Sequence, residues 1–286
     1  MDEVEALAKP RLITQNRLVH LNIGGSTMQL EGQVAVITGG AEGIGRGFAV
    51  AFAEQGANVA SLDIDAISNQ ETIRQVREKG SDGLAIDCDV ADKNQVRRAF
   101  NSVVQRFGRI DILVNNAAVW VDTALTSGTY DTQAVAFEDS MDICTLGSFY
   151  CALAAVPAMQ SQGGGTILNV ITEHIHEGHL ITGMAPATGY DCAKWAQWRL
   201  TETWAAELKP HNIRVNALCM GATDSPMFRA THDSPAEVMP TDIAQAALNI
   251  LAHGQDGPTG ESYLFAASGT SREQSLREIA ALAPGG

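Results

Sequence analysis

Short apolar runs alternate with longer amphipathic segments along most of the chain. The runs are rich in β-branched residues and nearly continuous, which is typical of parallel strands that are covered on both faces. We expect strands at 34–38, 58–63, 83–87, 111–115, 166–171, 213–218 and 262–266. The intervening segments have helical periodicity, most clearly at 43–56 and at 93–108, where Gly108 marks the end of the helix.

The regular alternation of strand and helix sets the fold class. Parallel strands joined through helices require right-handed crossovers, which predict an α/β doubly wound parallel sheet with helices on both faces. No linker, repeat or low-complexity segment interrupts the pattern. We therefore expect a single domain of about seven strands over residues 28–286. Residues 1–27 are expected to be a poorly ordered N-terminal arm; a partner contact or a misassigned start are the alternatives.

Composition and charge exclude several classes of partner. The chain has 286 residues, of which 45% are hydrophobic and 18% charged, so it can bury a substantial core. Its 33 acidic and 19 basic residues give a net charge of −14, which repels nucleic acid and anionic membranes. No signal-like or membrane-spanning apolar run is present, and no CxxC pair occurs among the five cysteines. We expect a soluble cytoplasmic protein with reduced thiols.

A glycine-rich turn follows the first strand in "VAVITGGAEGIGRGFAVAF" and opens the first helix. Gly39, Gly43 and Gly45, with Ile44 in the turn, would let the backbone approach a pyrophosphate, which the helix N-terminus stabilises. The strand–turn–helix context favours a dinucleotide site, although glycines can also serve packing alone.

Asp63 ends the second strand, about 20 residues beyond the glycine loop. A carboxylate at this position can accept hydrogen bonds from the adenosine ribose and would repel a 2′-phosphate. Glu42 lies within the loop, and no Arg or Lys adjoins Asp63. These features favour NAD over NADP, unless Asp63 is an ordinary acid at a strand end.

The pentapeptide "YDCAK" places Tyr190 and Lys194 four residues apart, on one face of a helix. Alone, this pair is also compatible with a plain helix surface. Together, "TGGAEGIG", "NNAA" and "YDCAK" resemble the motifs of the classical short-chain dehydrogenase/reductase family, in order and in approximate spacing. The resemblance covers about Gln33 to Gly269 and implies a Rossmann-type fold that binds NAD(P).

This resemblance implies roles for three residues. Tyr190 would be the general acid/base, and Lys194 would bind the nicotinamide ribose and lower the tyrosine pKa, which is about 10 in a free phenol. Thr172 occupies the position of the family's catalytic serine and would polarise the substrate oxygen, unless it is only a β-branched strand residue. Cys144 stands where the family often has an asparagine that anchors a water-mediated relay. An altered relay or a contribution from Thr145 is expected there.

Further cofactor contacts follow from the same resemblance. The segment around "DCDV" would meet the adenine, "NNAA" would lie beneath the adenosine, and "CMGATDSPM" would reach the carboxamide and the pyrophosphate. The last of these loops is expected to lead into a mobile substrate lid near 223–240. The residues concerned are Asp89, Val90, Asn115, Asn116, Ala117, Gly221, Thr223 and Ser225.

The substrate pocket is expected to be mostly apolar and suited to a cyclic or aromatic molecule. We assign it Trp120, His174, Met184 and Met227, from the loop at 173–187, the segment near Val119 and the lid. His174, His176 and His179 also suggest a metal site, but no ligand signature accompanies them and hydride transfer needs no metal, so we expect none. The helix bearing Tyr190 carries three tryptophans for packing or a subunit contact, and the family default is a homotetramer, with a homodimer as the alternative.

The sequence therefore predicts an NAD-dependent dehydrogenase that interconverts a secondary alcohol and its ketone. One alternative is an NADPH-dependent carbonyl or 3-oxoacyl-carrier reductase of the same family, against which Asp63 argues. The other is a non-catalytic dinucleotide-binding sensor, which Cys144 and Thr172 would favour and Tyr190 with Lys194 would not.

Overall fold

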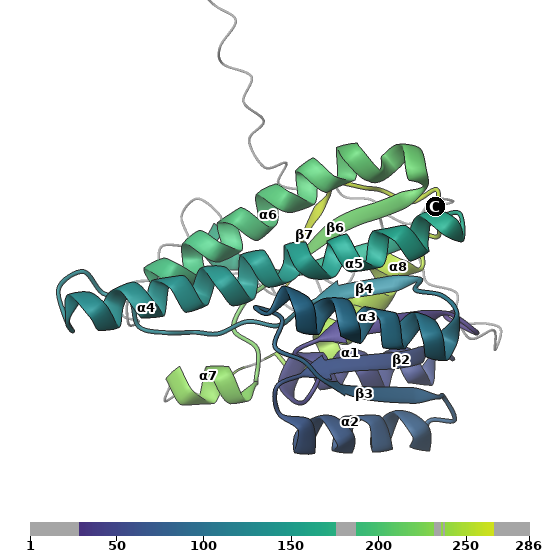
Figure 1. Cartoon of the computed structure of the whole chain (residues 1–286), viewed down its shortest axis with the longest axis horizontal. Helices are drawn as coiled ribbons and strands as arrows, with labels where there is room; N and C mark the ends of the chain where they lie inside the picture. The colour runs from purple at the N-terminus through teal and green to yellow at the C-terminus, as the bar shows by residue number, and fades with distance from the viewer. Residues whose placement is uncertain (1–28, 176–186, 232–235, 237, 266–286) are drawn as a thin grey trace, which may run out of the picture.

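Seven parallel strands form one sheet in the computed structural model, which describes residues 29–175, 187–231, 236 and 238–265 (Figure 1). The strand order is β3-β2-β1-β4-β5-β6-β7. The predicted α/β doubly wound sheet is confirmed, and the strand bounds differ from the predicted ones by about two residues at most. The strands are β1 Val34–Thr38, β2 Asn58–Asp63, β3 Gly83–Asp87, β4 Ile112–Asn115, β5 Gly165–Thr172, β6 Ile213–Met220 and β7 Ser262–Phe265.

The strand order reverses at β1, and this reversal positions the candidate site. From β1 the chain builds outward first through β2 and β3, and then returns to add β4 on the other side. Val36 of β1 is consequently in register with Ala60 of β2 and with Leu113 of β4. In such sheets the loops diverge at the carboxyl ends of the strands, leaving a crevice at the point of reversal.

Helices cover both faces of the sheet (Figure 1). One face is covered by α1, α2 and α8, and the opposite face by α3, α5 and α6. The helices are α1 Gly43–Glu54, α2 Ala66–Glu78, α3 Lys93–Phe107, α4 Tyr130–Ser140, η1 Met141–Leu146 (a π-helix), α5 Gly147–Ser161, η2 Glu173–Ile175 (3₁₀), α6 Thr188–Leu208, η3 Lys209–His211 (3₁₀), α7 Pro226–Thr231 and α8 Pro240–Leu251.

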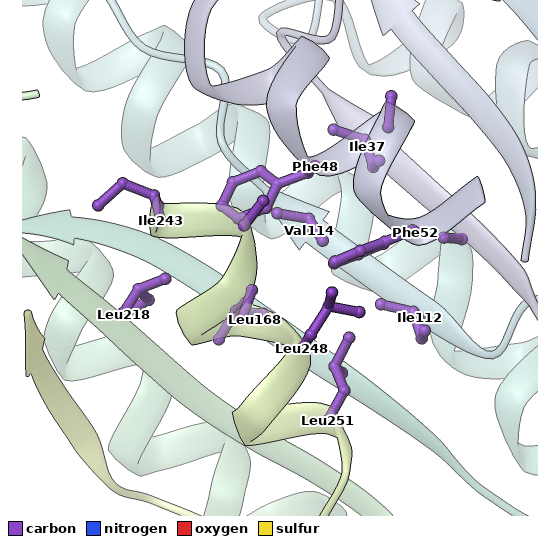
Figure 2. Packing of buried hydrophobic residues seen from close by; sticks show 14 of the residues in the cluster. Ile37, Phe48, Phe52, Ile112, Val114, Leu168, Leu218, Ile243, Leu248 and Leu251 are labelled. Carbon is purple, nitrogen blue, oxygen red and sulfur yellow. The ribbon is translucent and has the colours of Figure 1, made fainter. Parts of the chain in front are cut away.

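The continuous apolar strands divide their side chains between two cores. In β1, Ala35 and Ile37 point into the core beneath α1 and α8, whereas Val34 and Val36 point into the core beneath α3 and α5. In the first core, Phe48 and Phe52 of α1 lie against strand residues and α8 (Figure 2). Burying each of these rings stabilises the fold by about 1.5–3 kcal/mol. The packing holds the first turn of α1 at the sheet's carboxyl edge.

Both helices predicted most clearly from the sequence form where expected. Helix α3 begins after Asp92, whose side chain accepts from the backbone N–H groups of Asn94 and Gln95. It ends at Gly108, which has the positive φ of 76° that glycine adopts readily. Helix α1 ends at Glu54, slightly before its predicted end.

Helices α4, η1 and α5 follow one another without a break from Tyr130 to Ser161. A capping box starts this composite helix, in which the Thr129 side chain accepts from Thr132 N and the Thr132 side chain accepts from Thr129 N. By length and composition alone it could cross a membrane, with a mean hydropathy of 1.4 over its best window, although the sequence has no uninterrupted apolar run of that length. Core helices of soluble proteins can have the same length and composition, and 33% of that window is buried within the protein.

Several sequence predictions fall outside the described residues. These are the N-terminal arm at 1–27, most of the histidine-rich loop, part of the expected lid and the C-terminal segment from 266 onward. The division into an arm and a domain therefore stays a prediction.

Candidate functional site

A cavity of about 410 Å³ opens at the carboxyl ends of the central strands. Its lining comes from the loops after β1, β2, β3 and β4, the end of β2, the first turn of α1, and parts of η1, β5, α6, β6 and α7. All of the cofactor positions predicted from the sequence line it except Asn115, Gly221 and Thr223. The predicted residues that do so are Gly39, Glu42, Gly43, Ile44, Gly45, Asp63, Asp89, Val90, Asn116, Ala117, Tyr190, Lys194 and Ser225.

The sequence analysis missed several lining residues. Most lie inside the quoted motifs or within two residues of Asp63, so they are direct neighbours of the predicted positions. Ile143 and Val170 are different, because they are apolar residues of η1 and β5 that carry no local signal. The missed residues are Ala41, Leu62, Ile64, Asp65, Cys88, Ala118, Ile143, Val170, Met220 and Pro226.

The glycine loop fits closely against its neighbours. A Cβ atom on Gly45 would lie 1.9 Å from the carbonyl oxygen of Gly39, and one on Gly39 would lie 2.9 Å from Ala117 Cα. Glu42 occupies the N-cap of α1, but no side chain caps the helix. The first-turn N–H groups therefore remain available to an anion beside the cavity, and the loop fits a dinucleotide pyrophosphate.

The Asn116 side chain fixes the same loop from β4. Its Nδ2 donates to the carbonyl oxygens of Thr38 at 2.9 Å and Gly39 at 3.1 Å. The Thr38 hydroxyl in turn accepts from the backbone N–H groups of Asn116 and Ala117, both at 3.0 Å. These bonds join β1 and β4 at the reversal of strand order, where the cavity lies.

Carboxylates dominate one end of the cavity. Asp63 Oδ2 accepts from Ala41 N at 2.9 Å, and its Oδ1 accepts from Asp65 N at 3.0 Å. Asp65 also caps α2, and hydrogen bonds from Ser68 hold the Asp65 pKa below its usual value. Glu42 and Asp89 add two more acids to the lining. This end would repel a phosphate on the ribose 2′-oxygen.

The charge of Arg46 contributes to lowering the Asp65 pKa, but the Arg46 guanidinium is held by other hydrogen bonds. Its Nε donates to Thr72 Oγ1 at 2.9 Å, and its guanidinium also donates to the carbonyl oxygens of Ala41 and Ser68. It does not line the cavity, and Lys194 is the only cation among the described residues that do.

Tyr190, Lys194 and Thr172 are brought together in the cavity region from α6 and β5. Tyr190 is 7% exposed and Lys194 2%, and the Lys194 Nζ lies 5.7 Å from the centre of the Tyr190 ring. Thr172 is 6% exposed, and hydrogen bonding by its side chain lowers the Tyr190 pKa. The i, i+4 spacing read from the sequence thus places phenol and ammonium side by side.

The electrostatics of Tyr190 differ from the expectation that Lys194 lowers its pKa. Burial raises the Tyr190 pKa, and interactions of the phenol with Cys144 and Asp191 raise it further, whereas side-chain hydrogen bonding by Thr172 acts in the opposite direction. Burial also lowers the pKa of Lys194. Desolvation outweighs the lysine within the protein, so a phenolate needs additional positive charge, such as an oxidised nicotinamide ring would bring.

The Lys194 ammonium is held by two acceptors. Its Nζ donates to the Val170 carbonyl oxygen at 2.7 Å and to Gln197 Oε1 at 3.0 Å. Thr145, the expected substitute in the relay, instead donates its hydroxyl to the Ala193 carbonyl at 3.1 Å. Cys144 is fully buried within the π-helix η1.

An aromatic group adjoins the tyrosine. The Trp120 ring centre lies 4.9 Å from that of Tyr190 and 5.6 Å from that of His174. His174 Nδ1 lies 2.9 Å from Asp191 Oδ1. Trp120 and His174, both predicted to bind the substrate, therefore lie beside the Tyr190 ring, although neither lines the 410 Å³ cavity.

The remaining predicted site residues have varied positions. Met227 lines the cavity from α7. Gly221 N donates to Phe265 O at 3.2 Å and Thr223 bridges to Val238, so both shape the loop after β6 beside the cavity. Met184 lies outside the described residues, as do His176 and His179. Within the described part of the chain, no three His, Cys, Asp or Glu side chains come together as metal ligands would.

The tryptophans of α6 take different environments. Trp204 is buried, whereas Trp195 is 51% exposed. The Trp195 and Trp198 rings share a face, with centres 5.1 Å apart. Trp198 packs on a small core of Ile171, Ala217 and Cys219.

Comparison with known proteins finds similarity to dehydrogenases and reductases. The family model for short chain dehydrogenase matches residues 33–236. The chain is 33% identical over 235 residues to the 3-oxoacyl-[acyl-carrier-protein] reductase FabG of Thermotoga maritima, covering 82% of this chain and 88% of that protein. It is 34% identical over 248 residues to the 3alpha-hydroxysteroid dehydrogenase of Mediterraneibacter gnavus, covering 84% and 92%.

Solved structures agree with this similarity. A short-chain type dehydrogenase/reductase from Mycobacterium marinum superposes with a TM-score of 0.76 at 30% sequence identity, covering 85% of this chain and 98% of that chain. Each of these matches covers more than four fifths of this chain.

Proposed function

This chain belongs to the short-chain dehydrogenase family of oxidoreductases, and we propose that it is an NAD-dependent member that interconverts a secondary alcohol and its ketone. The observation that carries the proposal is the buried Tyr190, which lies beside the Lys194 ammonium and lines a cavity suited to a dinucleotide. A nicotinamide dinucleotide, when bound, would accept or supply the hydride.

The protein's own residues would handle the proton and the orientation. In the oxidation direction Tyr190 takes the proton of the substrate hydroxyl, and in reduction it returns that proton to the carbonyl oxygen. The Thr172 hydroxyl hydrogen-bonds the same substrate oxygen and stabilises the charge that develops on it. Lys194 holds the ribose and keeps a positive charge near the phenol. The Trp120 and His174 rings exclude water from one side.

The acidic end of the cavity supports NAD. Asp63 would accept hydrogen bonds from the ribose hydroxyls, while Glu42, Asp65 and Asp89 add negative potential against a 2′-phosphate. The similarity to FabG proteins favours the competing assignment, an NADPH-dependent 3-oxoacyl reductase. We favour NAD because Lys194 is the one cation among the described lining residues, and its ammonium is hydrogen-bonded to Val170 and Gln197.

We further propose a mostly apolar substrate, cyclic or aromatic, bound by Trp120, His174, Met184 and Met227. The ring group around Tyr190 supports this, as does the relative named for a hydroxysteroid. We also propose a cytoplasmic protein in which residues 28–286 form one domain behind the 1–27 arm, with a lid near 223–240. Homotetramers are proposed, with homodimers as the second possibility.

The exposed apolar stripe of the composite helix supports self-association. Leu146, Phe149 and Leu153 are 40%, 41% and 63% exposed. Their spacing of three and four residues puts them on one helix face. Solvent-exposed apolar stripes of this kind mark contact surfaces.

A panel of secondary alcohols tests the proposed activity. Cyclohexanol, 1-phenylethanol and a 3-hydroxysteroid would each be incubated with NAD or NADP while reduced cofactor is followed by absorbance. We expect turnover with NAD that falls by about 10²–10⁴-fold in Tyr190→Phe, the usual contribution of a general acid/base. Binding of NAD without oxidation of any alcohol or reduction of any ketone would favour the non-catalytic sensor instead.

A further inference from the structure

A chain of buried hydrogen bonds connects Lys194 to the π-helix. Lys194 Nζ donates to Gln197 Oε1 at 3.0 Å, and Gln197 Nε2 donates to Ser148 Oγ at 2.8 Å and to the Asn115 carbonyl at 3.3 Å. Ser148 Oγ then donates to the Cys144 carbonyl at 2.7 Å. We refer to Lys194, Gln197 and Ser148 as the buried amide network.

Each member of the network is almost inaccessible to solvent. Lys194 is 2% exposed, Gln197 0% and Ser148 5%. A buried ammonium must be hydrogen-bonded, since an unpaired charge in the interior is costly. Gln197 Oε1 and the Val170 carbonyl satisfy two of the three Nζ–H donors. The third remains for a ligand in the cavity that Lys194 lines.

The network occupies the region where the resemblance implied an asparagine. Cys144 holds that position and offers no amide, but its backbone carbonyl ends the chain of bonds through Ser148. Gln197 supplies an amide from α6 instead, three residues after Lys194, where the two side chains meet on one helix face. A side-chain amide thus reaches the ammonium from a different element.

We propose that Gln197 is a positioning residue that holds the Lys194 ammonium in its catalytic orientation, with Ser148 fixing the Gln197 amide. The inference rests on the proposed dehydrogenase function. Gln197 does not line the cavity; it acts through Lys194 and therefore on the ionisation of Tyr190.

Other ionisable groups face the same pair. Cys144 from η1, Asp191 from α6 and Cys219 from β6 all raise the Tyr190 pKa, and the His174 ring lies 6.1 Å from the Tyr190 ring. The neighbouring Glu173 acts on Cys219. Burial already disfavours the Lys194 ammonium. Loss of the Gln197 acceptor would disfavour the ammonium further and leave less positive charge beside the Tyr190 phenol.

The test compares Gln197→Leu with the wild type on whichever panel alcohol turns over fastest. We expect kcat/KM for oxidation to fall about tenfold, and the pKa of its acid limb to rise by about one unit, because a hydrogen bond to a charged group is worth about one factor of ten or more. The NAD dissociation constant, measured by tryptophan fluorescence, is expected to rise by about three- to tenfold.

Thr201→Val is the matched control. Thr201 is buried one turn further along α6, where its Oγ1 donates to the Gln197 carbonyl at 3.1 Å and accepts from Asn169 Nδ2 at 2.9 Å. It makes no hydrogen bond to Lys194. Its variant should lose thermal stability yet keep the wild-type pH profile. An equal shift in Thr201→Val, or an unshifted profile in Gln197→Leu, overturns the proposal.

Ser148→Ala provides a second arm should Gln197→Leu not fold. It releases the Gln197 amide, so a smaller shift in the same direction is expected, and an unchanged profile counts against the network. A wild type that oxidises no panel alcohol refutes the proposed function instead, which separates the two failures.

Discussion

His174 and Asp191 form a pair beside the Tyr190 ring, with Nδ1 and Oδ1 2.9 Å apart. The His174 side chain is 14% exposed and the Asp191 side chain 42%, so the carboxylate is more accessible to solvent than the imidazole. The contact fixes the ring orientation and leaves Nε2 as the nitrogen that can meet a substrate polar group.

We expect substitutions of this pair to affect substrate binding more than the chemical step. His174→Ala should raise KM for the alcohol by about tenfold, the value of one hydrogen bond with a charged or strongly polarised donor, with a smaller change in kcat. Asp191→Asn should raise KM by about two- to fivefold, since it leaves the imidazole in place but less firmly held. Steady-state kinetics with the alcohol varied at saturating NAD measures KM and kcat for each variant. A fall in kcat with an unchanged KM in both variants would contradict a role in substrate binding.

The pH dependence should follow the ionisation of Tyr190. Burial raises the pKa of this phenol, so the protonated form dominates at neutral pH unless the bound oxidised cofactor stabilises the phenolate. Oxidation requires the phenolate, and its kcat/KM should rise about tenfold per pH unit below the operative pKa. Reduction requires the phenol and should decline above that pKa. Initial rates in both directions from pH 5 to 11 measure this, and a flat profile in both directions would exclude Tyr190 as the titrating base.

Cofactor choice should depend on Asp63. Replacing it in Asp63→Asn removes a negative charge next to the ribose while retaining an acceptor for Ala41 N, so use of NADP should increase. We expect the ratio of kcat/KM for NAD over NADP to fall by about 10- to 100-fold, as one charge interaction of about 1.4–2.8 kcal/mol would give. Asp87→Asn is the control, because Asp87 pairs with Asp63 in register across β2 and β3 but does not line the cavity. A wild type that already prefers NADP refutes the assignment.

Self-association should require the stripe on the composite helix. A homotetramer would have a mass of about 121 kDa, four times the 30.3 kDa of one chain. Phe149→Glu with Leu153→Glu would introduce charges at an apolar contact and should yield smaller species in sedimentation velocity. Val104→Glu on α3, another exposed apolar position, serves as the control. A monomeric wild type would rule out the tetramer.

The fold could be predicted closely because its signals are local. Apolar runs such as 34–38 are continuous only when both faces of a strand are covered, and Gly108 ends α3 through its positive φ. The glycine loop likewise needed only its own context of strand, turn and helix. The i, i+4 spacing of Tyr190 and Lys194 was sufficient to place both on one helix face.

Other features depend on segments that are distant in the sequence. Gln197 meets Ser148 across a separation of 49 residues, and His174 meets Asp191 across 17. Neither contact has a local pattern, because hydrogen bonds between side chains on different elements depend on how those elements pack. The rise in the Tyr190 pKa was missed for the same reason: desolvation is a property of the surrounding packing.

The sequence by itself determined the parallel sheet, the dinucleotide loop and the identity of the tyrosine and lysine pair, since periodicity and short spacings encode them directly. Only the tertiary structure decided which acceptors hold the lysine, which rings surround the tyrosine and which acids gather at one end of the cavity. These contacts form where β1, β4, β5 and α6 converge. Burial in this region is the largest cause of the pKa shifts of Tyr190 and Lys194.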